Sequence, residues 1–172
     1  MLNDPPDLPT WRRTALAALR VSVVYTSTAQ QLRQGPAILT CNHESLIDGI
    51  AVAFASPVPL CFAVTPDYAI RNRATARGLS ILSRLGLGTV VPLSQDSPMA
   101  LRGLLAALRE GQSVMIFPTG TIRAEAETKR GYRWLAEKAG CPILTASISG
   151  ASRSLLFAKN GSALRPRITL TF

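Results

Sequence analysis

The sequence predicts a single-domain α/β fold with a mainly parallel central sheet flanked by helices. Short runs rich in Val, Ile and Leu alternate along the chain with longer segments that follow helical spacing. The length of 172 residues suits one domain that buries a core, and the chain shows no internal repeat, linker or low-complexity tract. Hydrophobic residues make up 47% and charged residues 17%, which excludes an intrinsically disordered chain.

The first predicted helix begins at Pro9 and Thr10 and continues through Trp11-Arg12-Arg13. Its apolar residues fall on one side and its arginines on another. Two interpretations are open: an amphipathic helix at a membrane interface, or a helix that packs on the core with solvated arginines. We therefore treat residues 1–20 as a candidate membrane-interfacial segment and residues 21–172 as the main domain.

The later elements follow from the residue pattern. Runs of β-branched and other apolar residues predict strands, and apolar residues three and four apart predict helices. The predicted strands are Val21–Thr26, Ala37–Cys41, Leu60–Val64, Thr89–Leu93, Val114–Phe117, Ile143–Ile148 and Ile168–Phe172. The predicted helices are Leu46–Ala55, Asp67–Leu85, one opened by Ser97 and Pro98 and ended by Gly111, and Lys129–Ala139, ended by Gly140. Because the chain stops on a predicted strand, we expect a C-terminally truncated or divided domain.

The charge balance points to an anionic partner. Lys and Arg outnumber Asp and Glu by 19 to 10, and a net charge of +9 predicts attraction to nucleic acid or to an anionic membrane surface. Arginines scattered over several elements, with few interleaved aromatic residues, argue against nucleic acid. The uncharged stretch Gly49–Pro66 nearly reaches the length of a membrane span, but Pro57 and Pro59 interrupt it. A helix followed by a strand is expected there instead.

The cysteines and the N-terminus bear on the compartment. Cys41, Cys61 and Cys141 are odd in number and lack metal-ligand spacing, so reduced thiols are expected. The N-terminus lacks the charged and then apolar run of a secretory signal. We expect a cytoplasmic protein that binds peripherally to the inner face of the membrane.

His43 is the only histidine in the chain, and it lies between a predicted strand and a predicted helix whose first turn carries Asp48. Catalytic groups of α/β folds are usually displayed at such junctions. If Asp48 accepts the imidazole N–H, the other ring nitrogen is prepared to take a proton. The competing interpretation is structural, because Ser45 and Asp48 have the spacing of a capping box. A serine-hydrolase triad is disfavoured, since no Gly-x-Ser-x-Gly sequence occurs.

A second segment, Phe117-Pro118-Thr119-Gly120-Thr121-Ile122-Arg123, also directly follows a predicted strand. Gly120 lets the backbone approach a ligand, and neighbouring N–H groups can cradle an anion. Arg123, Lys129 and Arg130 add positive charge nearby. A plain strand-to-turn junction accounts for Pro118 to Gly120 equally well.

Together the two segments resemble the lysophospholipid acyltransferase family, the 1-acylglycerol-3-phosphate acyltransferases and their relatives. The family's Asn-His-x-x-x-x-Asp motif is matched by Asn42, His43 and Asp48, and its Phe-Pro-Glu-Gly-Thr-Arg motif by Phe117, Pro118, Gly120 and Thr121. Lys129-Arg130 is similar to a later basic motif of the family. Within the family, the chain is most similar to the acyltransferase half of the bifunctional 2-acylglycerophosphoethanolamine acyltransferase/acyl-carrier-protein synthetases.

The resemblance implies an O-acyltransferase that uses His43 as the general base, with Asp48 beside it. It implies an acyl thioester donor, either acyl-carrier protein or acyl-CoA, a lysophospholipid acceptor, and no metal or other cofactor. The implied substrate-binding residues are Asn42, Phe117, Pro118, Thr119, Gly120, Thr121, Arg123, Lys129 and Arg130. Thr119 stands where the family has Glu, and Gly88–Leu93 lacks the arginine of another family motif. The alternative is therefore a catalytically impaired lipid- or acyl-carrier-binding protein on the same fold.

Overall fold

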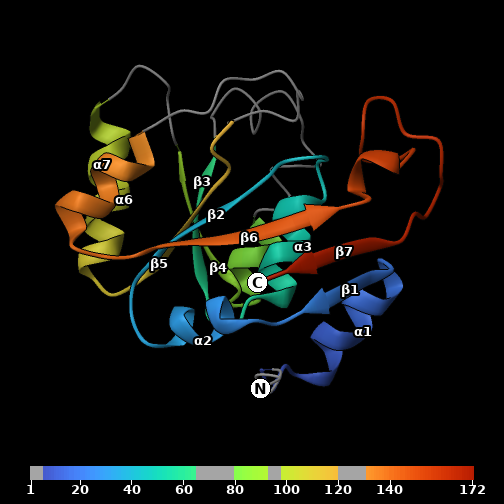
Figure 1. The fold of residues 1–172 in the computed structure, drawn as a ribbon, viewed down its shortest axis with the longest axis horizontal. Helices are drawn as coiled ribbons and strands as arrows, with labels where there is room; N and C mark the ends of the chain where they lie inside the picture. The colour runs from blue at the N-terminus through green and yellow to red at the C-terminus, as the bar shows by residue number, and fades with distance from the viewer. Residues whose placement is uncertain (1–5, 65–79, 93–97, 120–130) are drawn as a thin grey trace.

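The computed structural model describes residues 6–64, 80–92, 98–119 and 131–172 (Figure 1). In this part of the chain, seven strands form a sheet with the order β1-β7-β6-β2-β5-β3-β4. The strands are β1 (Val21–Val24), β2 (Ile38–Cys41), β3 (Leu60–Val64), β4 (Gly88–Pro92), β5 (Ser113–Ile116), β6 (Ile143–Ser149) and β7 (Ile168–Thr171). The helices are α1 (Thr10–Ala18), α2 (Ser27–Arg33), α3 (Asp48–Ala55), α6 (Pro98–Arg109), α7 (Gly131–Ala139) and the short 3₁₀ helix η1 (Ala151–Arg153). All strand pairs are parallel except β6–β7, so the predicted α/β fold is confirmed.

Helices cover both faces of the sheet, as expected for parallel strands that are buried on both sides (Figure 1). Consecutive residues of β2 show how the faces divide. Leu39 packs in one core cluster with Val52 of α3, whereas Ile38 packs in the other with Leu104 of α6 and Leu135 of α7. Because successive side chains of a strand point to opposite faces, α3 lies on one face and α6 and α7 on the other.

Some predicted boundaries differ from the observed ones. β3 has the predicted bounds, whereas β1 ends at Val24 rather than at Thr26. Thr26 instead caps α2, a helix that the sequence did not predict, and its hydroxyl accepts a hydrogen bond from the Thr28 N–H at 3.3 Å. Of the predicted helix Asp67–Leu85, residues 67–79 lie outside the described residues, and residues 80–84 are helical. The predicted boundary residues Leu93, Ser97 and Lys129 also lie outside them.

α1 is held against the end of α3 by two neighbouring side chains. Trp11 meets Phe54 edge to face, with the ring centroids 5.8 Å apart. The half-buried guanidinium of Arg12 donates hydrogen bonds to the carbonyls of Phe54, Ala53 and Ser56 at 2.8, 2.9 and 2.5 Å. These carbonyls end α3, so Arg12 satisfies groups that the helix leaves unpaired, and burial lowers the Arg12 pKa. A solvated role was wrong for Arg12, while a membrane-interfacial role for residues 1–20 stays a prediction.

The uncharged stretch that begins at Gly49 forms most of α3 and then β3, the predicted helix followed by a strand. Among the described residues, none of the helices combines the length and the apolar character that a bilayer span requires.

The sheet brings the two motif segments together at one edge. β2 pairs in parallel with β5, and Thr40 lies opposite Ile116. Both strands therefore end at the same edge of the sheet. Asn42 and His43 follow β2 there, and Phe117 follows β5.

Candidate active site

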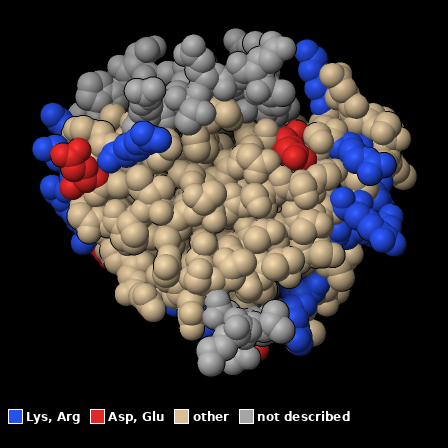
Figure 2. Space-filling model, in the orientation of Figure 1, with Lys and Arg blue, Asp and Glu red and all other residues tan. Residues whose placement is uncertain are grey.

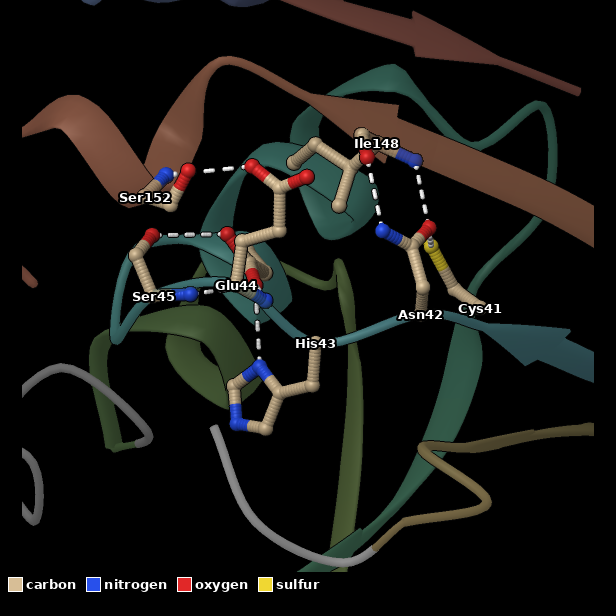
Figure 3. Close-up of polar contacts among 8 residues, drawn as sticks. Cys41, Asn42, His43, Glu44, Ser45, Ile148 and Ser152 are labelled. Carbon is tan, nitrogen blue, oxygen red and sulfur yellow. Dashed lines mark hydrogen bonds and ion pairs between the residues drawn. The ribbon is translucent and has the colours of Figure 1, made fainter. Parts of the chain in front are cut away.

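His43 and Asp48 converge as predicted, one from the loop after β2 and the other from the first turn of α3. His43 Nδ1 lies 2.9 Å from Asp48 Oδ2. Asp48 exposes none of its surface, whereas the His43 side chain is 17% exposed. Figure 3 shows the second ring nitrogen of His43 on the side of the ring away from the polar cluster. The imidazole thus has a buried carboxylate on one side, and its second nitrogen points away from that carboxylate.

The hydrogen bonds of Asp48 fix the histidine tautomer. Asp48 Oδ2 accepts the backbone N–H groups of Glu44 and Ser45 at 2.6 and 2.8 Å, so this oxygen is an acceptor. His43 Nδ1 must then donate its hydrogen to Oδ2, which leaves Nε2 of the neutral ring as a proton acceptor. Asp48 Oδ1 accepts the Ser45 hydroxyl at 2.7 Å. The carboxylate is therefore fully engaged although it is buried.

These same contacts show that the two interpretations of Asp48 are compatible. The Ser45 N–H bond to Asp48 is one half of a capping box. In place of the other half, the Asp48 N–H donates to the Ser45 backbone carbonyl at 3.3 Å. Asp48 thus closes the turn that starts α3 and holds the imidazole with the same carboxylate.

Asn42 anchors the start of this loop to the neighbouring strand β6. Its amide Nδ2 donates to the Ile148 carbonyl at 2.7 Å, and its Oδ1 accepts the Ile148 N–H at 2.8 Å (Figure 3). The side chain thereby extends the β2–β6 pairing beyond Cys41, where the strand ends. Asn42 holds the residue before His43 in place, and its predicted contact with substrate stays a prediction.

Phe117, the first residue after β5, packs against His43. Its ring stacks on the His43 imidazole with the centroids 4.1 Å apart and the planes at 19°. Pro118 and Thr119 follow in a turn and are partly buried. The other predicted substrate-binding residues, Gly120, Thr121, Arg123, Lys129 and Arg130, lie outside the described residues.

Most of the chain also matches a known family. The model of the Acyltransferase family covers residues 22–149, which include both motif segments. The chain belongs to the Acyltransferase family.

A solved structure shares the fold of this chain. It is the 1-acyl-sn-glycerophosphate (LPA) acyltransferase PlsC from Thermotoga maritima, which is similar with a TM-score of 0.62 and 21% sequence identity. The similarity covers 94% of this chain and 64% of PlsC, so this chain spans less than two thirds of that protein's length.

The charges of the loop after β2 also act on the nearest cysteine. Cys41 precedes Asn42 and exposes 2% of its surface. Burial, and then the nearby charges of Asp48 and Glu44, raise its pKa to about 12. The thiol therefore stays protonated, and Cys41 is a packing residue rather than a nucleophile.

Two hollows in the described residues lie away from His43. One of about 820 Å³ lies between α6 and α7 and is lined by Leu101, Leu105 and Trp134, among others. One of about 300 Å³ lies at the opposite edge of the sheet, near Leu60 and Gly88. No group of side chains suited to a metal ion occurs within the described ranges.

Sequence reasoning missed two contacts that hold the loop. The Glu44 carboxylate accepts the backbone N–H of Ser152 at 3.0 Å (Figure 3). The Leu46 N–H donates to the Phe157 carbonyl at 2.9 Å. Both partners lie more than a hundred residues further along the chain, so no local pattern could have shown the pairing.

Proposed function

We propose that this acyltransferase moves a fatty acyl group from an acyl thioester to the hydroxyl of a lysophospholipid-type acceptor. The observation that carries the proposal is the His43–Asp48 pair, 2.9 Å apart, with a buried carboxylate and Nε2 left as an acceptor. The donor is proposed to be acyl-carrier protein or acyl-CoA. The site of action is proposed to be an anionic membrane surface, at the inner face of the membrane.

The chemistry needs one base and two proton transfers. The acceptor hydroxyl donates a hydrogen bond to His43 Nε2, which takes the proton as the oxygen attacks the thioester carbonyl carbon. The buried Asp48 carboxylate stabilises the imidazolium that forms. As the tetrahedral intermediate collapses, the carbon–sulfur bond breaks, the ester is released, and the imidazolium returns the proton to the departing thiolate.

The second motif segment is proposed to hold the substrates. Phe117 and Pro118 would form the wall beside the imidazole, since Phe117 already stacks on it. Backbone N–H groups near Gly120 would stabilise the oxyanion. The basic residues Arg123, Lys129 and Arg130, with Thr121, would bind the acceptor head group. The family resemblance favours 2-acylglycerophosphoethanolamine as acceptor. The similarity to PlsC, a 1-acyl-sn-glycerophosphate acyltransferase, favours 1-acylglycerophosphate.

One observation favours a second candidate function. Thr119 occupies the place of the family's glutamate, so a carboxylate is missing beside the turn after β5. A protein that binds lipids or acyl-carrier protein without efficient turnover would fit this change.

Turnover assays distinguish the two functions. The protein is incubated with mixed lysophospholipids and either acyl-carrier-protein or CoA thioesters, and the lipids are identified by mass spectrometry. We expect a diacyl product, and we expect His43→Ala to lower turnover by about 10² to 10⁴, the usual contribution of general base catalysis.

Thermal unfolding of His43→Ala serves as the control: the variant should still fold and unfold cooperatively, with a loss of about 1 to 3 kcal/mol because the buried Asp48 carboxylate loses one donor. Full turnover by the alanine variant would overturn the mechanism. Binding without product, for every acceptor and donor pair, would favour the second function.

A further inference from the structure

The connection between β6 and β7, residues 150–167, carries the most exposed large apolar side chains among the described residues. We call this segment the leucine loop. Leu155, Leu156 and Leu164 are 58, 61 and 62% exposed. In Figure 1 the segment extends outward from the end of β6, at the right of the view. Apolar side chains that cluster on a surface mark a site of interaction with another apolar body.

The leucine loop is folded, so its leucines are held outward by the backbone. Leu155 N–H donates to the Ala163 carbonyl at 2.8 Å, which brings Leu155 and Leu156 beside Leu164. Ser154 is 2% exposed and pairs with Ala163 in an isolated bridge. A Cβ on Gly161 would lie 2.0 Å from the Ser154 carbonyl oxygen, so the two arms of the loop are in close contact. The three leucines therefore lie on neighbouring backbone segments that hydrogen bonds and close packing hold in place.

The charges of the leucine loop have one sign. Residues 150–172 contain Arg153, Lys159, Arg165 and Arg167 and no Asp or Glu. All four basic residues are exposed. Figure 2 shows blue side chains along the right edge of the molecule, the side on which Figure 1 draws this segment. A segment that combines exposed leucines with exposed basic residues is complementary to a bilayer with anionic head groups.

The leucine loop is also joined to the catalytic loop, residues 42–48. Ser152 N–H donates to the Glu44 carboxylate at 3.0 Å, and Leu46 N–H donates to the Phe157 carbonyl at 2.9 Å. Both bonded residues of the catalytic loop, Glu44 and Leu46, lie between His43 and α3 in the sequence. The leucine loop is therefore tied by two hydrogen bonds to the segment that carries His43 and Asp48.

We propose that the leucine loop is a membrane-insertion surface of this protein. Leu155, Leu156 and Leu164 enter the interfacial region of an anionic phospholipid bilayer, and the four basic residues contact lipid phosphates. The bonds to Glu44 and Leu46 then hold the catalytic loop at the membrane surface. The proposal concerns bilayer contact, and it rests on the proposed function only in assigning a lipid acceptor to that loop.

Vesicle binding tests the proposal without any acyl transfer. Leu155→Ser, Leu156→Ser and Leu164→Ser are combined, and binding to vesicles of phosphatidylglycerol and phosphatidylcholine is measured by co-sedimentation. The matched control combines Ile81→Ser, Leu85→Ser and Ile143→Ser, which are 51, 45 and 41% exposed and lie outside the leucine loop. We expect roughly 100-fold weaker binding for the leucine variant, from the apolar area it can no longer insert, and less than roughly threefold weaker binding for the control.

A charge pair of variants tests the cations separately. Arg153→Gln with Lys159→Gln should weaken binding to anionic vesicles roughly 30-fold and should leave binding to pure phosphatidylcholine vesicles unchanged. Arg109→Gln with Lys138→Gln, exposed residues of α6 and α7, provides the control of equal charge.

Three outcomes would overturn the proposal: unmodified protein that does not bind anionic vesicles, a leucine variant that binds as the unmodified protein does, or equal losses in the leucine variant and its control. A requirement for a protein partner would appear as the first of these.

Turnover on a short-chain lysophospholipid that stays monomeric in solution separates this inference from the proposed function. If the protein is inactive on every acceptor but the leucine variant loses vesicle binding, the proposed function fails and the membrane surface stands. If the variant keeps turnover on the monomeric acceptor and loses it on vesicles, both stand.

Discussion

The catalytic loop and the leucine loop follow two neighbouring parallel strands, β2 and β6, yet they place their side chains in opposite directions. In the catalytic loop, polar groups turn inward, and Ser45 and Asp48 expose none of their surface. In the leucine loop, apolar groups turn outward, and Leu156 and Leu164 expose more than half of theirs. Each loop thus reverses the ordinary preference of its residues.

The reversals have different physical reasons. A buried carboxylate is tolerated only where its oxygens are saturated, and Asp48 accepts hydrogen bonds from His43, Glu44 and Ser45. Exposed leucines need no partner in water, but they need a backbone that keeps them from folding back. The polar cluster therefore satisfies its hydrogen bonds within the protein, whereas the exposed leucines become buried only when another apolar body covers them.

Asp48→Asn should have the largest effect of any single change in the catalytic loop. An amide presents an N–H₂ group to backbone N–H donors, and it removes the charge behind the imidazole. We expect turnover to fall by about 10² to 10⁴ and the free energy of unfolding to fall by about 1 to 3 kcal/mol. Steady-state kinetics and chemical denaturation measure the two losses.

Ser45→Ala is the matched control for Asp48→Asn, because it removes one hydrogen bond to the same carboxylate and keeps the charge. It should cost about 1 kcal/mol of stability and little turnover. If Asp48→Asn loses stability alone and keeps its turnover, the carboxylate serves only the start of α3, and the comparison between the loops concerns folding rather than chemistry.

Gly150→Ala should strain the backbone at the start of the leucine loop, and it changes no residue of the catalytic loop. Gly150 has φ +85°, and a Cβ there would lie 2.4 Å from the Arg167 carbonyl oxygen. We expect a loss of about 1 to 3 kcal/mol, together with faster tryptic cleavage after Arg153 and Lys159. Denaturation and limited proteolysis followed by mass spectrometry measure these effects.

Gly140→Ala provides the control, since Gly140 also has a positive φ, +65°, but a Cβ there would meet no atom of the described residues within 4 Å. It should cost about 1 kcal/mol and leave the cleavage pattern unchanged. Equal cleavage in the two variants would mean that the close approach to Arg167 does not hold the loop.

Much of the fold could be predicted from residue spacing alone. The uninterrupted apolar run Leu60–Val64 defined β3, and the leucine spacing after Pro98 defined α6. α2 was missed because its seven residues are mostly polar and short, with only Ala29 and Leu32 buried. Thr26, the N-cap of α2, was assigned to the predicted strand Val21–Thr26 because it follows a run of β-branched residues.

In the candidate site, too, contacts between residues close in the sequence could be predicted, whereas contacts between distant residues could not. That His43 and Asp48 would meet followed from local order, a loop residue and a first-turn residue of one helix. The two bonds between Asn42 and Ile148 did not, because β6 becomes the neighbour of β2 only in the folded sheet. The exposure of Leu155, Leu156 and Leu164 could not be predicted either. Leucine side chains are usually buried, and the sequence does not show which way these three point.

Thr119→Glu should have the smallest effect. It tests whether turnover requires a carboxylate at position 119, in the turn after β5. Thr119 follows Phe117 and Pro118, and the Phe117 ring lies against the imidazole. A carboxylate there could accept hydrogen bonds from acceptor hydroxyls, and a hydrogen bond to a charged group contributes about 1.5 kcal/mol. We expect the variant to gain turnover roughly tenfold on lysophospholipids, measured as kcat/KM.

Thr119→Gln has nearly the same size without the charge, so it distinguishes the carboxylate from the bulk of the side chain. A gain in the glutamate variant alone assigns the effect to charge and supports a lysophospholipid acceptor. If the unmodified protein is instead active on another acceptor and both variants lose that activity, threonine is the selected residue and the acceptor class proposed above is wrong. Unchanged rates in both variants, on every acceptor, would show that position 119 does not govern acceptor use. Acceptor choice would then have to depend on other residues of the catalytic loop and the leucine loop.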